Sequence, residues 1–385
     1  MWFVGPGGAF FACHHPGHLI FFDAGDAVVL ELHGDLADQL AECCRQGRPP
    51  SPVSASRLRA LAVALGDEAQ ALLLALQQGL VRLASPRDLV RADGYHQLWI
   101  ELTVRCNERC VHCYADAGPE RTDSLERDTV LAAIADAARL GFRQVQLTGG
   151  DPLLCPFLLD ATAAAHAAGL EVEVFTNGLL LSPALLDSLL ACDVSFAFSL
   201  YGADAAIHDR VTRTSGSFLR TVDAIRRAAA AGAEVRIGVV VVAENVAAAE
   251  ETLTFARTLV ARPHAVRLVA AREVGRGRIA PDLSAGERKP CDDLVPPPPK
   301  AWVAHGRAAL CADGEVRPCI FTRWLSLGCV GRDGTLAHIL EAPQISSQSR
   351  PTPTLEAFCA DRLTCRFCRR TAISLEHLAH VHAPS

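Results

Sequence analysis

The chain has 385 residues, of which 50% are hydrophobic and 15 are cysteine, and its net charge is −6. The acidic balance excludes a general affinity for nucleic acid, and no apolar run reaches the ~18 residues of a membrane span. We expect a cytoplasmic protein whose thiols serve metal or redox chemistry, because MWFVGPGG lacks the basic and apolar regions of a signal peptide.

Residues 1–94 begin with short strand-like stretches that are separated by glycine-containing turns. The stretches are AFFACHH, HLIFF and AVVLEL. Helical patterns follow at 35–45 and 55–83, across the Pro/Ser-rich joint RQGRPPSPVSAS. This part of the sequence predicts a small α+β module.

From residue 97 onward, strand and helix patterns alternate. The predicted strands are 97–103, 143–149, 171–177, 194–200, 234–242 and 265–270, and the predicted helices are 125–140, 155–168, 182–191, 217–231 and 246–261. The strands are rich in Val, Ile, Leu and Phe, as expected for parallel strands buried on both faces. The pattern predicts an α/β fold, a partial (β/α)6 barrel of the TIM type, whose site lies at the carboxyl ends of the strands.

A third region follows a joint that contains PPPP at 296–299. It is rich in cysteine and weakly periodic, which indicates a small domain held by metal. We therefore predict three domains: residues 1–94, 95–280 and 281–385.

The segment CNERCVHCY (106–114) places three cysteines in a C-x3-C-x2-C pattern directly after the first predicted barrel strand. A closed structural zinc site needs four ligands, usually as two C-x2-C pairs. Three ligands on one loop leave a coordination position open, which suits a catalytic metal centre. The alternative is a zinc knuckle completed by His112 or by a distant residue.

This loop resembles that of the radical S-adenosylmethionine (radical SAM) enzymes, which is Cx3Cx2C with an aromatic residue, here Tyr114, beside the last cysteine. The resemblance covers about 97–270 and, with the C-terminal region, roughly three quarters of the chain. It implies that Cys106, Cys110 and Cys113 hold three irons of a [4Fe–4S] cluster whose fourth iron binds S-adenosylmethionine (SAM). An external electron donor of the flavodoxin or ferredoxin type would then drive cleavage of SAM to a 5′-deoxyadenosyl radical.

The second predicted strand ends in LTGGDPL (147–153), which resembles the Gly-Gly-Glu-Pro element of the same family. The resemblance implies that Gly149, Gly150 and Asp151 contact SAM through the backbone, with Asp151 in place of the usual Glu. Two glycines would also let the backbone approach a ligand that side chains would keep away.

Two further strand ends and one loop carry matches to the family. Asn177 lies in FTNG after the third strand. Ser199 in SLYG lies at the end of the fourth strand, and it is either a hydrogen-bonding partner of the SAM ribose or carboxylate or a serine that caps its strand. Within IHDRVTRTSGSF (207–218) the resemblance implies an arginine for the SAM carboxylate, for which Arg213 is the candidate and Arg210 flanks the same place.

The C-terminal region holds seven cysteines: Cys291, Cys311, Cys319, Cys329, Cys359, Cys365 and Cys368. The segments LCADGEVRPC and FCADRLTCRFC resemble the SPASM or shorter twitch extension of radical SAM enzymes, which binds one or two auxiliary [4Fe–4S] clusters. The spacing departs from the full pattern, since Glu356 replaces its first Cys of C-x2-C and no cysteine follows Cys368.

Seven thiols cannot ligate two complete clusters, so we expect one auxiliary cluster. Its implied ligands are Cys319, then Cys365 and Cys368, with the fourth drawn from Cys291, Cys311 or Cys359. A second, open cluster is one alternative, and a structural zinc site is the other, because C-x2-C also suits zinc.

The N-terminal module resembles the PqqD-like peptide-binding domain that is found fused to peptide-modifying enzymes. The resemblance rests on pattern, and it implies that an exposed edge strand pairs with the leader of a precursor peptide. An oligomerisation or barrel-capping domain is the alternative.

Together the three parts resemble maturases of ribosomally synthesised peptides, which implies formation of a thioether or C–C crosslink. A radical SAM enzyme acting on a small molecule in tetrapyrrole, cofactor or antibiotic biosynthesis is the second hypothesis. A non-catalytic metal-binding scaffold is the third.

Overall fold

The structure is a computed structural model that describes residues 2–5, 10–15, 18–23, 29–52, 54–56, 72–85, 94–262, 265–271, 274–277, 306–323 and 325–343. The predicted ligands Cys291, Cys359, Cys365 and Cys368 lie outside the described residues. Residues 57–71 of the predicted N-terminal helical pattern also lie outside them.

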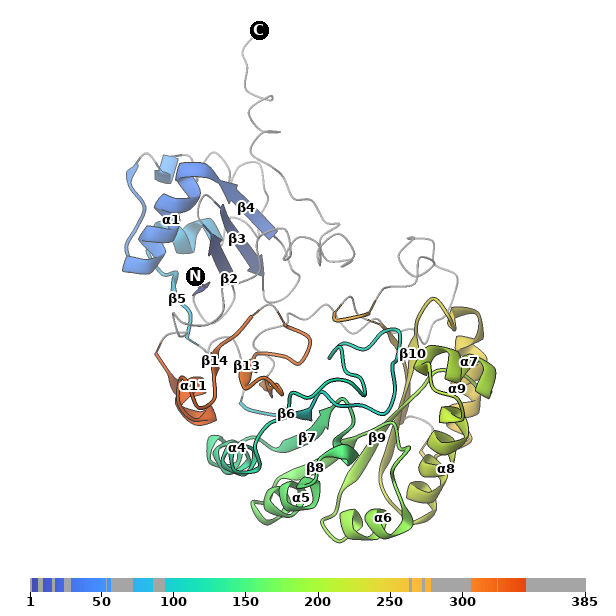
Figure 1. The fold of residues 1–385 in the computed structure, drawn as a ribbon. Helices are drawn as coiled ribbons and strands as arrows, with labels where there is room; N and C mark the ends of the chain where they lie inside the picture. The colour runs from blue at the N-terminus through green and yellow to red at the C-terminus, as the bar shows by residue number, and fades with distance from the viewer. Residues whose placement is uncertain are drawn as a thin grey trace.

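The N-terminal module is an antiparallel sheet of order β4-β3-β2-β1-β5, and helix α1 and the helical residues 72–77 share its apolar core (Figure 1). Its elements are β1 (Trp2–Val4), β2 (Phe10–His15), β3 (His18–Asp23), β4 (Val29–His33), α1 (Gly34–Gln46) and β5 (Arg82–Leu83). Strands β2, β3 and β4 match the predicted stretches. The predicted helix end at 83 is wrong, because Arg82 and Leu83 pair with β1 across the sheet.

The central sheet contains the six predicted parallel strands in chain order. They are β6 (Gln97–Thr103), β7 (Gln144–Gly149), β8 (Glu171–Phe175), β9 (Ser195–Leu200), β10 (Val235–Val241) and β11 (Val266–Ala270). Each strand hydrogen-bonds in parallel with the next one along the chain. The prediction of an α/β fold built on a parallel partial barrel is confirmed.

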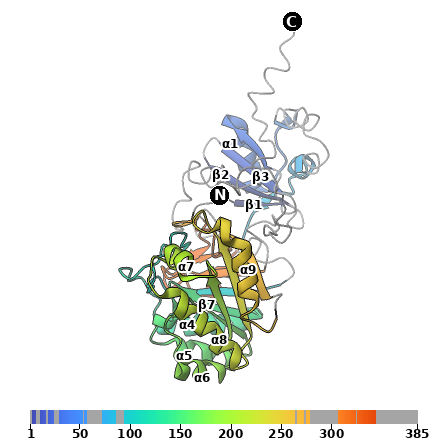
Figure 2. The same ribbon diagram turned by 90° about the vertical axis from the view of Figure 1, so that its right-hand side faces the viewer.

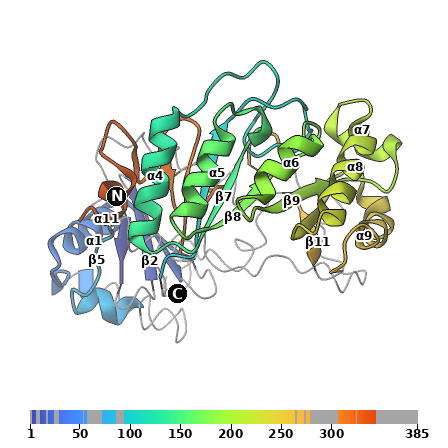
Figure 3. The same cartoon turned by 90° about the horizontal axis from the view of Figure 1, so that it is seen from below.

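The helices that connect these strands form an arc on the outer side of the sheet (Figures 2 and 3). They are α4 (Arg127–Leu140), α5 (Leu158–Ala167), α6 (Pro183–Leu190), α7 (Ala205–Thr212), α8 (Ser217–Ala230) and α9 (Ala249–Arg257). Local signals set their ends: the Ser182 hydroxyl caps α6 ahead of Pro183, and Gly141 ends α4 with φ 85°. Over the described stretches, no helix has the length and apolar character to cross a bilayer.

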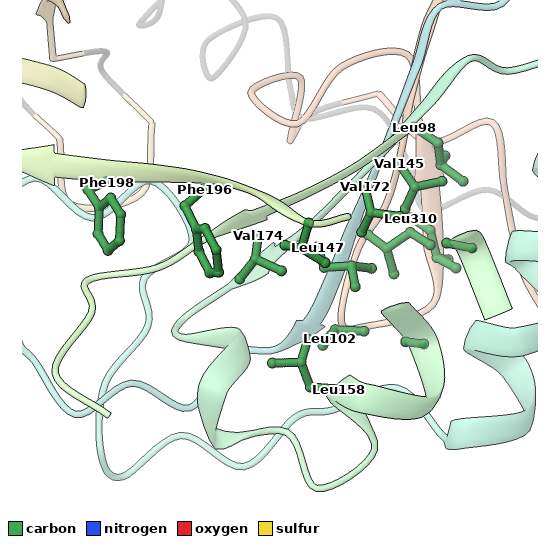
Figure 4. Close-up of a cluster of buried hydrophobic side chains, with 14 of the residues drawn as sticks. Leu98, Leu102, Val145, Leu147, Leu158, Val172, Val174, Phe196, Phe198 and Leu310 are labelled. Atoms are coloured by element: carbon green, nitrogen blue, oxygen red, sulfur yellow. The ribbon is translucent and has the colours of Figure 1, made fainter. Parts of the chain in front are cut away.

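The two faces of the central sheet differ in polarity. The outward side chains are apolar and pack beneath the helices (Figure 4); they include Leu98, Leu102, Val145, Leu147, Val172, Val174, Phe196 and Phe198. The inward side chains are largely polar and line a cavity; they include Gln97, Gln146, Thr148, Glu173, Ser199 and Arg236. Residues of both faces are buried along β6 and β7, as expected, but the inward face is polar and not apolar, because its side chains line the cavity.

The C-terminal region continues the barrel sheet beyond β6. It contributes β12 (Arg307–Leu310), β13 (Glu315–Arg317), β14 (Gly328–Cys329) and α11 (Leu336–Glu341). Strand β12 runs parallel to β6, and it forms an antiparallel hairpin with β13. Helix α11 contacts α4, where the Ala337 N–H donates to Asp136 Oδ2 at 2.8 Å. The predicted domain boundaries stay a prediction.

Candidate active site

The three cysteines of CNERCVHCY lie on the loop that leaves the carboxyl end of β6. All three line the cavity inside the barrel, whose volume is about 1020 Å³. Six other predicted site residues are Tyr114, Gly149, Gly150, Asp151, Asn177 and Ser199, and every one of them except Asp151 lines the same cavity. The structure thus brings together residues that are predicted from separate strand ends.

Backbone hydrogen bonds hold the cysteine loop against the end of α7. The N–H groups of Arg109 and Val111 donate to the carbonyls of Thr212 and Val211 at 3.1 and 3.0 Å. Arg276, far along the chain, donates from Nε to the Cys110 carbonyl at 3.1 Å and from Nη2 to the Ala117 carbonyl at 2.7 Å. These bonds anchor the cysteine loop to α7 and to the segment that contains Arg276.

The environment of the thiols keeps them protonated when no metal is present. Burial raises the pKa of Cys106, and the Asp151 carboxylate raises it further. Burial also raises the pKa of Cys110, and the negative charge of Glu108 is the next largest cause of this increase. A thiol that ligates a metal is deprotonated, so a cationic metal centre would reverse these shifts.

The donor set fits an iron–sulfur cluster. Thiolates are the ligands that such clusters prefer, and Cys106, Cys110 and Cys113 face one cavity from one loop. In the part of the chain that the structure describes, no three Cys, His, Asp or Glu side chains converge around one point as a single ion would require. His112, the alternative zinc ligand, lines the cavity and makes an edge-to-face contact with Tyr201, with ring centroids 4.9 Å apart.

Glu108 lies inside the cysteine loop and is almost fully buried, with 3% of its surface exposed. The Ser217 hydroxyl donates to one of its oxygens, and the other oxygen lies 3.3 Å from the Cys110 Sγ. Burial raises the pKa of Glu108 to about 7, against the hydrogen bonds from Ser217 and Cys110. This carboxyl group was not among the predicted site residues, although it stands in the quoted loop.

Gly149 and Gly150 permit close packing between two strand ends. A Cβ atom on Gly149 would meet the Thr103 carbonyl oxygen at 2.2 Å, and one on Gly150 would meet the Arg105 carbonyl oxygen at 2.1 Å. Gly149 also has φ 134°. The absence of side chains at these positions lets β7 approach the backbone that leads into the cysteine loop, and the predicted contact with a ligand stays a prediction.

We expect Gly150→Ala to lower the free energy of unfolding by about 1–3 kcal/mol. A Cβ atom there would collide with the backbone carbonyl of Arg105, which cannot rotate away as a side chain could. Urea unfolding of the metal-free protein measures the effect. Gly238→Ala is the matched control in β10, since a Cβ there would meet only the Phe198 carbonyl oxygen at 3.9 Å. Equal stability of the two variants would contradict this account.

Asp151 joins the second and third strand ends. Its buried carboxylate accepts hydrogen bonds from the Leu153 N–H at 2.8 Å, the Thr176 hydroxyl at 2.9 Å and the Asn177 N–H at 3.1 Å. The Asn177 side chain in turn donates to Asn107 Oδ1 at 2.6 Å, beside Cys106. The carboxylate of Asp151 therefore supports the loops that surround the cavity and does not itself face it.

Stability should depend on pH through Asp151. Burial raises its pKa from 3.8 to about 6, so the folded protein binds this proton more tightly than the unfolded chain. The resulting stabilisation is complete below the unfolded pKa and is lost as pH rises through about 6. We expect the unfolding free energy of the metal-free protein to fall across this window, and to fall less in Asp151→Asn. Parallel pH profiles of the two proteins from urea titrations would refute the assignment.

Tyr114 links the cysteine loop to the loop that follows β13. Its ring makes an edge-to-face contact with Phe321, with centroids 5.3 Å apart, and the Arg323 guanidinium lies 5.3 Å from the centre of the Tyr114 ring. Arg323 makes a bidentate ion pair with Glu101 of β6, and the Nη1–Oε2 distance is 2.9 Å. The Glu101 side chain is fully buried. The loop after β13 is thereby attached to β6, the strand that leads into the cysteine loop.

Arg213 is separated from the other predicted site residues. It ends α7 with φ 53°, is exposed, and does not line the cavity. The predicted role of Arg213 at a SAM carboxylate gains no support from this position. Asn245, a buried residue after β10, donates to the Tyr201 carbonyl at 2.9 Å and ties two strand ends together.

Two of the predicted auxiliary ligands are among the described residues. Cys311 is fully buried at the end of β12, where it packs with Trp99, Ala309 and Ile320. Cys319 is partly exposed and lies against the same residues. Charged groups also lie near Cys311, among them Glu101 and Arg323, and the assignment of Cys311 and Cys319 as cluster ligands stays a prediction.

Comparison with known proteins connects these observations. Residues 100–256 match the family described as the radical SAM superfamily. The chain is 30% identical over 310 residues to the PqqA peptide cyclase of Ruegeria pomeroyi, covering 71% of this chain and 82% of that protein.

Two further similarities are more limited. The mycofactocin maturase MftC of Mycobacterium tuberculosis is 35% identical over 179 residues, so the match spans 46% of this chain and only 45% of that relative. The crystal structure of Streptococcus suis SuiB bound to the precursor peptide SuiA aligns with TM-score 0.50 and 13% identity, over 95% of this chain and 94% of that one. The structural likeness establishes a shared fold.

Proposed function

Because this chain belongs to the radical SAM superfamily, we propose that it reductively cleaves SAM and uses the resulting 5′-deoxyadenosyl radical to modify a ribosomally synthesised precursor peptide. Hydrogen abstraction would lead to a thioether or C–C crosslink. The observation that carries the proposal is the set of three thiols on one wall of a cavity of about 1020 Å³ at the strand ends.

Different residues that line the cavity would bind the cluster and SAM. Cys106, Cys110 and Cys113 would hold a [4Fe–4S] cluster, which supplies the electron for cleavage of the sulfonium and an open coordination site for SAM. Gly149, Asn177 and Ser199 would contact SAM, since they line the cavity beside the thiols, and Tyr114 would close its side toward β12.

An oxidative crosslink removes two hydrogens from the peptide, so a further electron must leave the substrate. An auxiliary [4Fe–4S] cluster could accept this electron, and Cys319 is its best-placed ligand among the described residues. Cys319 and Tyr114 pack against the same apolar residues, so an auxiliary cluster there would adjoin the cavity wall.

The N-terminal sheet would bind the leader of the precursor peptide. Its order places β4 and β5 at the edges, and β4 offers five residues of strand against two in β5. An extended leader could add to β4 through backbone hydrogen bonds while its core segment enters the barrel. The related PqqA peptide cyclase and the SuiB–SuiA complex support a peptide as substrate.

Anaerobic reconstitution tests the proposal directly. The protein is loaded with iron and sulfide and then given SAM, dithionite and the short peptide encoded beside its gene. We expect 5′-deoxyadenosine together with a peptide lighter by two hydrogens. A parallel reaction with a porphyrin precursor tests the small-molecule hypothesis, and turnover of that compound with no change to the peptide would overturn the peptide assignment. Failure to cleave SAM would overturn both.

A further inference from the structure

Four exposed arginines surround the back of the cysteine loop: Arg109, Arg210, Arg213 and Arg220. Arg109 belongs to the loop itself, and its N–H donates to the carbonyl of Thr212 at the end of α7. Arg210 and Arg213 lie at that end of α7, and Arg220 lies in the first turn of α8. Figure 3 shows α7 and α8 side by side at one end of the barrel. We call these four residues the arginine face.

The arginine face carries excess positive charge on a chain whose net charge is −6. Residues 205–220 contain three arginines and a single carboxylate, Asp209. Its two oxygens accept from the N–H groups of Gly216 at 2.7 Å and Phe218 at 2.8 Å. Arg210 and Arg220 donate only to backbone carbonyls among the described residues.

Two carboxyl groups offset part of this charge, since Arg220 interacts electrostatically with Glu108 and Glu120 lies near Arg109. Arg109 lies 3.4 Å from Glu120, but the side chains are 58% and 63% exposed, so this ion pair contributes little. For Arg213, no carboxylate lies within ion-pair distance in the part of the chain that is described.

Two of these arginines stand where local preferences disfavour them. Arg213 holds φ 53° at the end of α7, a conformation that glycine or asparagine adopts more easily. Arg220 lies near the amino end of α8, where the helix dipole disfavours a cation. Positions that break local rules are frequently functional ones.

The arginine face lies directly behind the thiols but outside the cavity. Ser217, between Arg213 and Arg220, donates to Glu108, whose second oxygen is 3.3 Å from the Cys110 Sγ. None of the four arginines lines the cavity. A substrate bound here could not reach the cavity, whereas an electron needs no open path.

We infer that the arginine face is the docking site for an acidic one-electron carrier protein of the flavodoxin or ferredoxin type. This inference rests on the proposed function, which requires an external electron source. Electron-transfer encounters use small interfaces, and complementary charge sets their rate and orientation.

Binding of purified oxidised flavodoxin to the full chain tests the docking site by surface plasmon resonance. Arg210→Glu with Arg220→Glu reverses charge on the arginine face, and Glu in the first turn of α8 suits the helix dipole. We expect the affinity to fall by about tenfold or more and to lose most of its salt dependence. Arg210→Gln with Arg220→Gln should give an intermediate loss.

Arg143→Glu with Arg226→Glu is the matched control. It makes the same change in charge at two exposed arginines, one before β7 at the opposite end of the strands and one later in α8. The control should bind flavodoxin like the unmodified chain. Equal binding by the reversed variant and the control would overturn the docking site.

A second readout separates this inference from the proposed function. The rate of SAM cleavage driven by flavodoxin is divided by the rate driven by dithionite, and the ratio should fall about tenfold in the reversed variant. Absence of dithionite-driven cleavage in the unmodified chain would refute the proposed function instead. Loss of peptide affinity with unchanged flavodoxin affinity would assign the arginine face to the peptide and overturn the inference.

Discussion

Replacing Cys106, Cys110 and Cys113 together by alanine is expected to abolish 5′-deoxyadenosine formation, down to the background without protein. The three thiols face the cavity, and no other described cysteine lines it, so the cluster that would drive SAM cleavage has no substitute ligands. Chromatographic analysis of SAM products and the iron content of the reconstituted protein measure the effect. An auxiliary cluster, whose ligands lie elsewhere in the chain, should remain visible by electron paramagnetic resonance.

Cys155→Ala is the control for loss of a thiol near the same region. Cys155 is buried among the apolar residues beneath the helices and does not line the cavity. This variant should retain SAM cleavage. Cleavage by the triple variant at the rate of the control would remove the basis for the assigned cluster ligands.

Replacing Arg323 by methionine is expected to lower the free energy of unfolding by about 3–5 kcal/mol, because it leaves the Glu101 carboxylate buried without its partner. Exposure of the two side chains is 26% for Arg323 and 0% for Glu101, so solvent cannot replace the lost ion pair. The change also removes the guanidinium above Tyr114. Urea unfolding of the metal-free protein measures the loss.

The double variant Glu101→Leu with Arg323→Met separates ion pairing from packing. Replacing both partners by apolar side chains removes the unpaired charge, so stability should return to near that of the unmodified protein. Arg262→Met is the surface control: its ion pair with Glu234 is exposed by 66% and 68%, and its loss should cost less than about 1 kcal/mol. A double variant as unstable as Arg323→Met would show that the destabilisation has another source.

The barrel strands could be predicted from sequence because local pattern determines them. Successive residues of QLWIELT also point to opposite faces of the sheet. Leu98 and Ile100 point outward to the helices, and Gln97 and Trp99 point inward to the cavity. The abundance of Val, Ile, Leu and Phe obscured that alternation. Helix α7 is absent from the predicted helices. It has only eight residues, too few to show a clear helical period after its cap, Asp204.

Only those parts of the site that lie in contiguous sequence motifs could be predicted from the sequence. The cysteine loop and the glycine pair are contiguous in sequence, so their positions after β6 and β7 follow from the strand pattern. The contacts that hold the loop are not local: Arg276 reaches Cys110 and Arg323 reaches Glu101, at separations of 166 and 222 residues. No spacing rule connects such pairs, because the folded barrel alone brings them together.

The pairing of β12 with β6 means that the central sheet cannot be completed until the C-terminal region has been synthesised. Strand β6 opens the barrel, yet its second neighbour is made some two hundred residues later, since Arg307 aligns with Gln97. Until the ribosome has released that neighbour, the edge of β6 that faces away from β7 presents a row of unpaired amide and carbonyl groups. Such a row is a template for joining another chain, so a product that terminates before β12 should aggregate through the very strand that leads into the cavity.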